Sequence, residues 1–180
     1  MNTPPCPSPS VGRPSPNLNL TLLQRREIEA QIVGPILRAV ALEIGTDKAL
    51  ELVRGVISDL ARRSGSELAL GLGEATLNAF ALGLDRWKEG GALEIDLLEQ
   101  TSERLSFNVT RCRYAEMYLA LGLADLGASL SCQRDFALVE GFNPAISLER
   151  SQTIMQGAPF CDFRFRHQPA TNEEPRGDPS

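Results

Sequence analysis

Three of the four cysteines lie among charged residues in the second half of the chain. They occur in the segments RCRYAE (111–116), SLSCQRD (129–135) and APFCDFRFR (158–166). Cysteine is among the residues most often buried, whereas arginine is mostly exposed, so their repeated association is unusual for a hydrophobic core. Cys112, Cys132 and Cys161 therefore indicate a site with chemistry of its own.

Nucleophilic attack by a thiolate is the first chemistry that these cysteines suggest. A helix N-terminus and a nearby arginine both stabilise a thiolate and lower the pKa of a cysteine. Cys132 lies near the predicted start of a helix and is followed by Arg134 and Asp135, so it is the best candidate nucleophile, with Cys161 second.

Two other interpretations of the cysteines stay open. They can pack as small buried hydrophobes, which is common for free cysteines. Alternatively, Cys112, Cys132 and Cys161 hold a divalent metal, with a carboxylate as a further ligand. The gaps of 19 and 28 residues between them, with no CxxC pair, argue against a zinc finger, and we expect no cofactor.

Arginines and carboxylates accompany the cysteines. A planar guanidinium binds a carboxylate through two parallel hydrogen bonds, so these arginines favour an anionic small-molecule partner. In the strand CDFRFR, alternation places Asp162, Arg164 and Arg166 on one face and Phe163 and Phe165 on the other. The polar face is either a solvated ion-pair ladder or the wall of a substrate pocket.

Several other catalytic chemistries have little support. The only histidine, His167, lies at the edge of the C-terminal tail, so a Ser-His-Asp or Cys-His arrangement is not favoured. The chain has no HExxH, no Walker loop and no GxGxxG between a strand and a helix.

The surrounding pattern predicts an α+β fold, with an N-terminal helical layer packed on a small antiparallel sheet and additional short helices. We expect one helix up to about residue 44, with Ile28, Ile32 and Ile36 in a core stripe. A second follows from Thr46 and closes at Ser64-Gly65, and a third runs from Ser66 to about residue 88. Strands are expected over 92–100, 103–112, 146–155 and 161–167, and helices over 113–127 and about 131–142.

Composition limits the partners and the location. The net charge is −5, so nucleic acid is not the expected partner, and Gln24-Arg25-Arg26 is interpreted as the solvated face of a helix. No segment has the length of a membrane span or the apolar core of a signal peptide, and we expect a cytoplasmic protein without a membrane partner. Residues 1–19 and 167–180 are expected to be disordered extensions of one domain over residues 20–166. A homo-oligomer stays open.

Four blocks in the second half carry a resemblance to a known family. They are FNVTRCRYAEMY (107–118), LGASLSCQRD (126–135), EGFNP (140–144) and RSQTIMQGAPFCDFRF (150–165). In order and spacing these blocks resemble the L-2-amino-thiazoline-4-carboxylic acid hydrolase family. The resemblance covers roughly residues 20 to 166 and is strongest in the second half.

The resemblance implies hydrolytic opening of a cyclic amidine that carries a carboxylate, with L-cysteine formation as the wider role. The nucleophile is then Cys132 or Cys161, and Asp135, Glu116 or Asp162 transfer protons and bind the amidinium. Arg113, Arg134 or Arg164 bind the carboxylate, and Asn108 and Tyr114 add hydrogen bonds. The alternatives are a small-molecule or metal-binding sensor that uses the same pocket without turnover, and a helical interaction module whose cysteines only pack.

Overall fold

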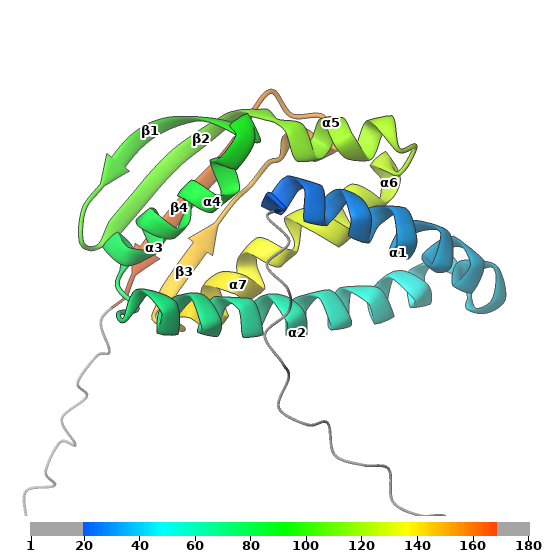
Figure 1. Ribbon diagram of the computed structural model, residues 1–180, viewed down its shortest axis with the longest axis horizontal. Helices are drawn as coiled ribbons and strands as arrows, with labels where there is room; N and C mark the ends of the chain where they lie inside the picture. Colours follow the sequence, from blue (N-terminus) through cyan, green and yellow to red (C-terminus); the bar gives the residue numbers. More distant parts are fainter. Residues whose placement is uncertain (1–19, 169–180) are drawn as a thin grey trace, which may run out of the picture.

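The structure is a computed structural model that describes residues 20–168 (Figure 1). It is an α+β fold, in which two long N-terminal helices lie beside a four-stranded antiparallel sheet with several short helices, as the sequence predicts. Residues 1–19 and 169–180, which the sequence predicts to be disordered, lie outside the described residues. Within residues 20–168, none of the helices combines the length and the apolar composition that crossing a bilayer requires.

The two long helices are α1 (Leu22–Ile44) and α2 (Thr46–Leu72). Thr21 caps α1 in a capping box, in which its hydroxyl accepts from the Gln24 backbone N–H and the Gln24 side chain accepts from the Thr21 N–H. The prediction that a helix closes at Ser64-Gly65 is wrong, because α2 continues to Leu72.

Gly65 belongs to a close helix contact and does not end a helix. A Cβ atom at Gly65 would lie 2.1 Å from the carbonyl oxygen of Leu138, and one at Gly141 would lie 2.0 Å from the carbonyl oxygen of Arg62. Two glycines thus let α2 touch α7 (Arg134–Phe142) backbone to backbone. This contact fixes the position of α7, which carries several site residues.

The predicted third helix is divided in the structure. Gly73 takes a left-handed conformation with φ of 74° and ends α2, and Thr76 then caps the short helix α3 (Leu77–Gly83). Helix α4 (Asp85–Lys88) and the 3-10 turn η1 (Glu89–Gly91) lead into the sheet.

The strands are β1 (Leu93–Gln100), β2 (Arg104–Cys112), β3 (Ile146–Glu149) and β4 (Cys161–His167). They lie in the order β1-β2-β4-β3 and every neighbouring pair is antiparallel. The strand expected over 146–155 ends at Glu149, and a loop with the 3-10 turn η3 (Ile154–Gln156) follows. His167, which the sequence places at the boundary between the last strand and the tail, is the last residue of β4 and pairs with Ile146.

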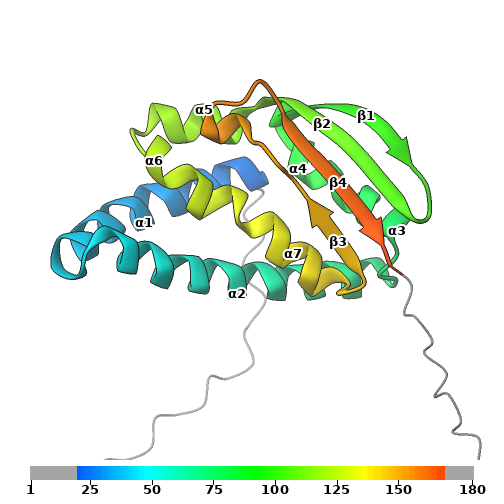
Figure 2. The ribbon, with the colours of Figure 1, turned by 180° about the vertical axis from the view of Figure 1, so that it is seen from behind.

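Helices α5 (Arg113–Ala120) and α6 (Ala124–Gly127), the π-helical turn η2 (Ala128–Cys132) and α7 connect β2 to β3. Alternation along β2 and β4 buries Leu105, Phe107, Phe163 and Phe165 against α3 and α7. The opposite face of the sheet, called the outer face below, is not covered by a helix of the described chain (Figure 2).

A second buried cluster joins α1 and α2 to α5, α6 and η2. Its α1 residues are Ala30 and Leu37, whereas Ile28, Ile32 and Ile36 are exposed. The prediction that this isoleucine stripe faces the core is therefore wrong. Ala30 and Leu37 thus face the neighbouring helices, and the three isoleucines point outward.

Candidate functional site

A cavity of about 90 Å³ lies where the two buried clusters meet. Its wall combines α1, α4, the sheet, α5, η2, α7 and the loop after β3. The lining residues are Leu22, Arg26, Trp87, Leu93, Val109, Cys112, Tyr114, Ser131, Cys132, Arg134, Asp135, Leu138, Arg150, Met155, Cys161 and Phe163. Three thiols, three guanidinium groups and one carboxyl group thus share a small, mainly apolar space.

Asp135 and Arg150 form the best enclosed ion pair of the cavity. The Arg150 side chain is only 5% exposed, and its Nη1 donates to Oδ2 of Asp135. Its Nη2 donates to the carbonyl oxygen of Cys132 at 3.0 Å, and its guanidinium lies 5.0 Å from the ring centroids of both Phe136 and Phe163. Arg150 therefore joins the loop after β3 to α7.

The same enclosure changes the acidity of Asp135. Burial raises the pKa of this carboxyl group from its ordinary value to about 6, although the Arg150 guanidinium opposes the shift. Near neutral pH such a group exchanges protons readily, which suits general acid–base chemistry.

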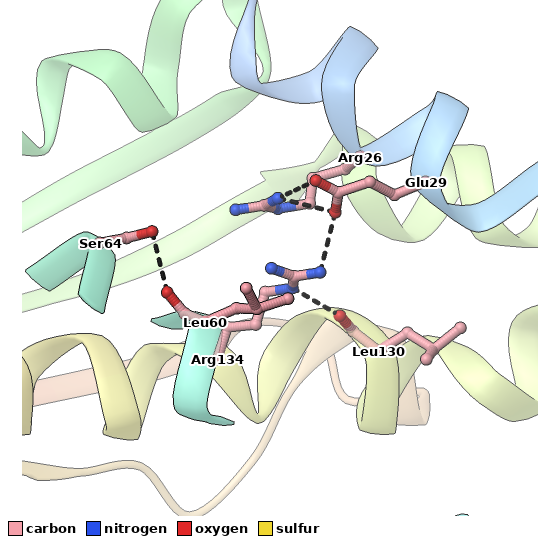
Figure 3. Close-up of polar contacts among 6 residues, drawn as sticks. All are labelled: Arg26, Glu29, Leu60, Ser64, Leu130 and Arg134. Atoms are coloured by element: carbon pink, nitrogen blue, oxygen red, sulfur yellow. Dashed lines mark hydrogen bonds and ion pairs between the residues drawn. The ribbon is translucent and has the colours of Figure 1, made fainter. Parts of the chain in front are cut away.

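Arg26, Glu29 and Arg134 form a chain of charges from α1 to α7 (Figure 3). Both carboxylate oxygens of Glu29 accept from Nη1 of Arg26, at 2.8 and 2.7 Å, and one also accepts from Nη2 of Arg134 at 2.8 Å. Arg134 donates in addition to the carbonyl oxygen of Leu130 at 2.8 Å. The Arg26 and Arg134 side chains are 16% and 12% exposed, so both cations are held largely away from water.

All three thiols line the cavity, as their common setting in the sequence suggests. Cys161 begins β4, and its sulfur accepts from the backbone N–H of Ile154 at 3.2 Å. Cys112 ends β2. Burial raises the pKa of each thiol, that of Cys112 to about 11 and that of Cys132 to about 12.

The expectation of a lowered Cys132 pKa is therefore wrong. Cys132 is the last residue of the π-helical turn η2, and the next residue, Gln133, keeps helical dihedral angles into α7. The thiol consequently lies within a nearly continuous helical stretch and gains no N-terminal dipole. The π-helical turn contributes Ser131 and Cys132 to the cavity wall, in keeping with the frequent occurrence of such turns at functional sites.

Tyr114 of α5 also lines the cavity. Its hydroxyl donates to the carbonyl oxygen of Trp87 at 3.3 Å, and burial raises the pKa of the phenol, so it stays protonated. This contact holds α4 against α5 at one end of the cavity. Cys132, Cys161, Asp135, Arg134 and Tyr114 are thus the predicted site residues that the structure brings together.

Three predicted site residues lie instead on the outer face of the sheet. Arg164 donates to Oδ1 of Asn108 and to the carbonyl oxygen of Phe107, each at 2.9 Å. Asp162 accepts from the backbone N–H groups of Ser151 and Gln152 and from the Ser151 hydroxyl. Burial alone would raise the pKa of Asp162, but these hydrogen bonds lower it below its ordinary value. Asp162, Arg164 and Asn108 therefore support the loop and the strands and do not line the cavity.

Two further predicted residues also lie outside the cavity wall. Glu116 pairs with Arg111, whose Nε lies 2.8 Å from Oε1, and this hydrogen bond lowers the Glu116 pKa. Arg113 donates to the carbonyl oxygen of Gly90 at 2.8 Å. Both residues follow Cys112 in sequence, but the turn from β2 into α5 directs them away from it.

Arg26, Trp87 and Arg150 line the cavity but were not among the predicted site residues. Arg26 contradicts the interpretation of Gln24-Arg25-Arg26 as a solvated face. The only sequence signal for it is Glu29, three residues later, which marks an ion pair on one helix face. Arg150 lies among the conspicuous arginines of the second half, yet only the folded chain brings it beside Asp135.

The geometry does not support a metal centre. Among residues 20–168, no three histidine, cysteine, aspartate or glutamate side chains are arranged to bind one metal ion. The alternative of a divalent metal held by Cys112, Cys132 and Cys161 therefore does not fit, and no step below uses a metal.

The model of the L-2-amino-thiazoline-4-carboxylic acid hydrolase family matches residues 25–165. The chain belongs to this family. The matched range contains every polar residue of the cavity wall. No curated protein matches this family member significantly.

Two solved structures are among those that match this family member. One is the phenol-responsive sensory domain of the transcription activator PoxR, solved with phenol, at a TM-score of 0.52 and 12% identity over 81% of this chain and 76% of that one. Another is a trafficking protein particle complex subunit 3 from Naegleria fowleri, covalently bound to palmitic acid. Its TM-score is 0.48 and its sequence identity 10%, and the match covers 83% of this chain and 98% of that one. At these identities the likeness to the PoxR domain concerns the fold alone.

Proposed function

We propose that the cavity hydrolyses the ring of a small cyclic amidine that carries a carboxylate, of the 2-aminothiazoline-4-carboxylate type. Family membership supports the substrate class. The observation that carries the reaction is Asp135, a carboxyl group inside a mainly apolar cavity with a pKa raised to about 6 by burial.

The charges around the cavity favour an anionic substrate. Arg26, Arg134 and Arg150 are balanced by only two carboxylates, Glu29 and Asp135. One positive charge is thus left over, which matches the single carboxylate of the substrate. Arg134 is the residue best suited to bind that carboxylate, because it lines the cavity and burial lowers its pKa, so an anion would relieve the cost of its burial.

Asp135 supplies the proton transfers of the reaction. It takes a proton from a water molecule, whose oxygen forms a bond to C2 of the ring. The tetrahedral intermediate then collapses, the bond between C2 and the ring sulfur breaks, and the leaving sulfur receives the proton from Asp135. The proton of the new hydroxyl group moves to the former ring nitrogen, so that C2 becomes the carbonyl carbon of the carbamoyl group. One water is consumed and N-carbamoyl-L-cysteine is released, with Asp135 again ionised.

The thiols favour this water route over a covalent one. Moving a proton from Cys132, with a pKa of about 12, to Asp135, with a pKa of about 6, is strongly unfavourable. Protonated Cys132 and Cys161 instead act as weak S–H donors beside the departing sulfur. Their proposed role thus moves from nucleophile to support of the leaving group.

The direct test is incubation of the purified chain with L-2-aminothiazoline-4-carboxylate. We expect a new free thiol and a product one water heavier, detected by thiol titration and mass spectrometry. A substrate that is bound but never consumed would overturn the hydrolase proposal.

That outcome would favour a second function, a ligand sensor that uses the same cavity without turnover. Its specific support is the protonated state of all three thiols, which leaves the cavity without a strong nucleophile of its own. The fold likeness to the PoxR sensory domain agrees with this alternative.

A further inference from the structure

A second and larger cavity, of about 440 Å³, adjoins the one described above. It lies among the start of α1, the C-terminal half of α2, and helices α3 and α4. Four residues line both spaces: Leu22, Arg26, Trp87 and Leu138. These shared side chains lie between the two spaces, which are therefore adjacent.

The lining of the outer cavity defines what such an extension contains. Its apolar part comes mainly from Leu68, Leu72 and Leu82, in addition to the shared leucines and Trp87. Its charged part comes from Arg25 and Arg86, besides the shared Arg26, against one carboxylate, Glu67. Within residues 20–168 neither arginine forms a salt bridge, whereas the arginines of the inner cavity are all paired.

We propose that the outer cavity binds the distal part of the substrate, an apolar spacer that ends in a second anionic group. The ligand class is thus an amphipathic molecule with an anion at each end, larger than a bare ring acid. The assignment of its inner anion depends on the proposed function, in which the inner cavity binds a carboxylate. The outer anion is assigned to Arg25 and Arg86. An unpaired guanidinium gains a charge-assisted hydrogen bond from such a group, and the leucines gain contact with the spacer.

The probes are linear dicarboxylates from butanedioate to decanedioate, each compared with the monocarboxylate of the same length by isothermal titration calorimetry. We expect the longer dicarboxylates to bind at least tenfold more tightly than the monocarboxylates of the same length, because only the dicarboxylates place a second carboxylate beside Arg86. If no chain length shows an advantage for the second carboxylate, the inference is wrong.

Two variants locate the effect. Arg86→Gln should reduce the dicarboxylate advantage to within about threefold while leaving monocarboxylates unchanged, and Arg63→Gln, an exposed position outside both cavities, should not. Leu82→Trp fills the outer cavity and should weaken every long probe at least tenfold, whereas Leu119→Trp should have no effect. Leu82 and Leu119 are 66% and 70% exposed, so both tryptophans are compatible with folding.

The same variants separate this inference from the proposed function. Leu82→Trp should leave turnover of L-2-aminothiazoline-4-carboxylate unchanged, since that acid fits the inner cavity alone. Turnover of the short acid without any dicarboxylate advantage would contradict the outer subsite and support the hydrolase function. Dicarboxylate binding that depends on Arg86, with no turnover of the short acid, would support the outer subsite and contradict the hydrolase function.

Discussion

The cavity and the outer face of the sheet each hold an aspartate, yet the pKa values of the two carboxyl groups shift in opposite directions. In the cavity, burial raises the pKa of Asp135 to about 6. On the outer face, hydrogen bonds from Ser151 and Gln152 lower the pKa of Asp162 below its ordinary value. Similar residue types thus produce a proton-transfer group in one place and a fixed structural acceptor in the other, because burial dominates at Asp135 and hydrogen bonds dominate at Asp162.

The largest difference between the two regions should appear in stability. Arg150→Met removes a buried cation and leaves Asp135 without its partner, and we expect a loss of about 3–5 kcal/mol in the free energy of unfolding. Arg166→Met removes an exposed outer-face ion pair with Glu149 and should cost about 1 kcal/mol or less. Urea denaturation of both variants measures this, and equal losses would contradict the comparison.

The thiols give the next largest contrast. With a pKa of about 11 for Cys112 and about 12 for Cys132, we expect alkylation by iodoacetamide at pH 8 to be about a hundredfold slower than for a free cysteine. A cysteine placed on the outer face by Thr110→Cys should react at an ordinary rate. The comparison uses a Cys6→Ser background, and urea-unfolded protein serves as the control. Rapid alkylation of folded protein would show that the cavity thiols are not protected.

Substrate binding should distinguish two arginines of the same type. Arg134→Gln should raise KM for L-2-aminothiazoline-4-carboxylate about ten- to a hundredfold, since one charge-assisted contact is worth about 1.5–3 kcal/mol. Arg164→Gln, on the outer face, should change KM less than threefold. Circular dichroism checks that both variants fold. A larger effect at Arg164 would move the substrate to the outer face.

The pH dependence provides the smallest predicted effect. Asp135 acts as a base only when ionised, so kcat/KM should fall about tenfold for each pH unit below its pKa of about 6 and level off above it. Rates measured from pH 4.5 to pH 8 would show this limb. A flat profile through pH 6 would exclude Asp135 as the titrating base.

The fold class could be predicted from sequence, because helical and strand periodicity are local patterns. The common setting of the three cysteines among charged residues suggested one site, but their meeting at the cavity depends on how β2, η2 and β4 pack together. Alternation in CDFRFR also separates Asp162 and Arg164 from the phenylalanines, and Cys161 shares the phenylalanine face. The residues predicted for the site nevertheless come from both faces, because proximity in sequence does not distinguish the two faces of a strand. Because successive residues of a strand point to opposite faces of the sheet, Cys161 lies at the cavity and Asp162 on the outer face.

Other features depend on contacts between distant segments. Arg26 of α1 is connected to Arg134 of α7 only through Glu29, a contact across 105 residues. Gly65 resembles a helix end in sequence, but its role appears only where α7 touches it. The raised thiol pKa values follow from burial, which a list of charged neighbours does not reveal.

The most direct test of the account is the turnover of L-2-aminothiazoline-4-carboxylate by two matched variants, Asp135→Asn and Asp162→Asn. Asparagine keeps the shape of each side chain, and at position 162 its oxygen can still accept from the backbone of Ser151 and Gln152. We predict a fall in kcat/KM of at least a hundredfold for Asp135→Asn, in the range of general-base catalysis, and of less than threefold for Asp162→Asn. Equal activity of the wild type and Asp135→Asn, or loss of turnover only in Asp162→Asn, would contradict it.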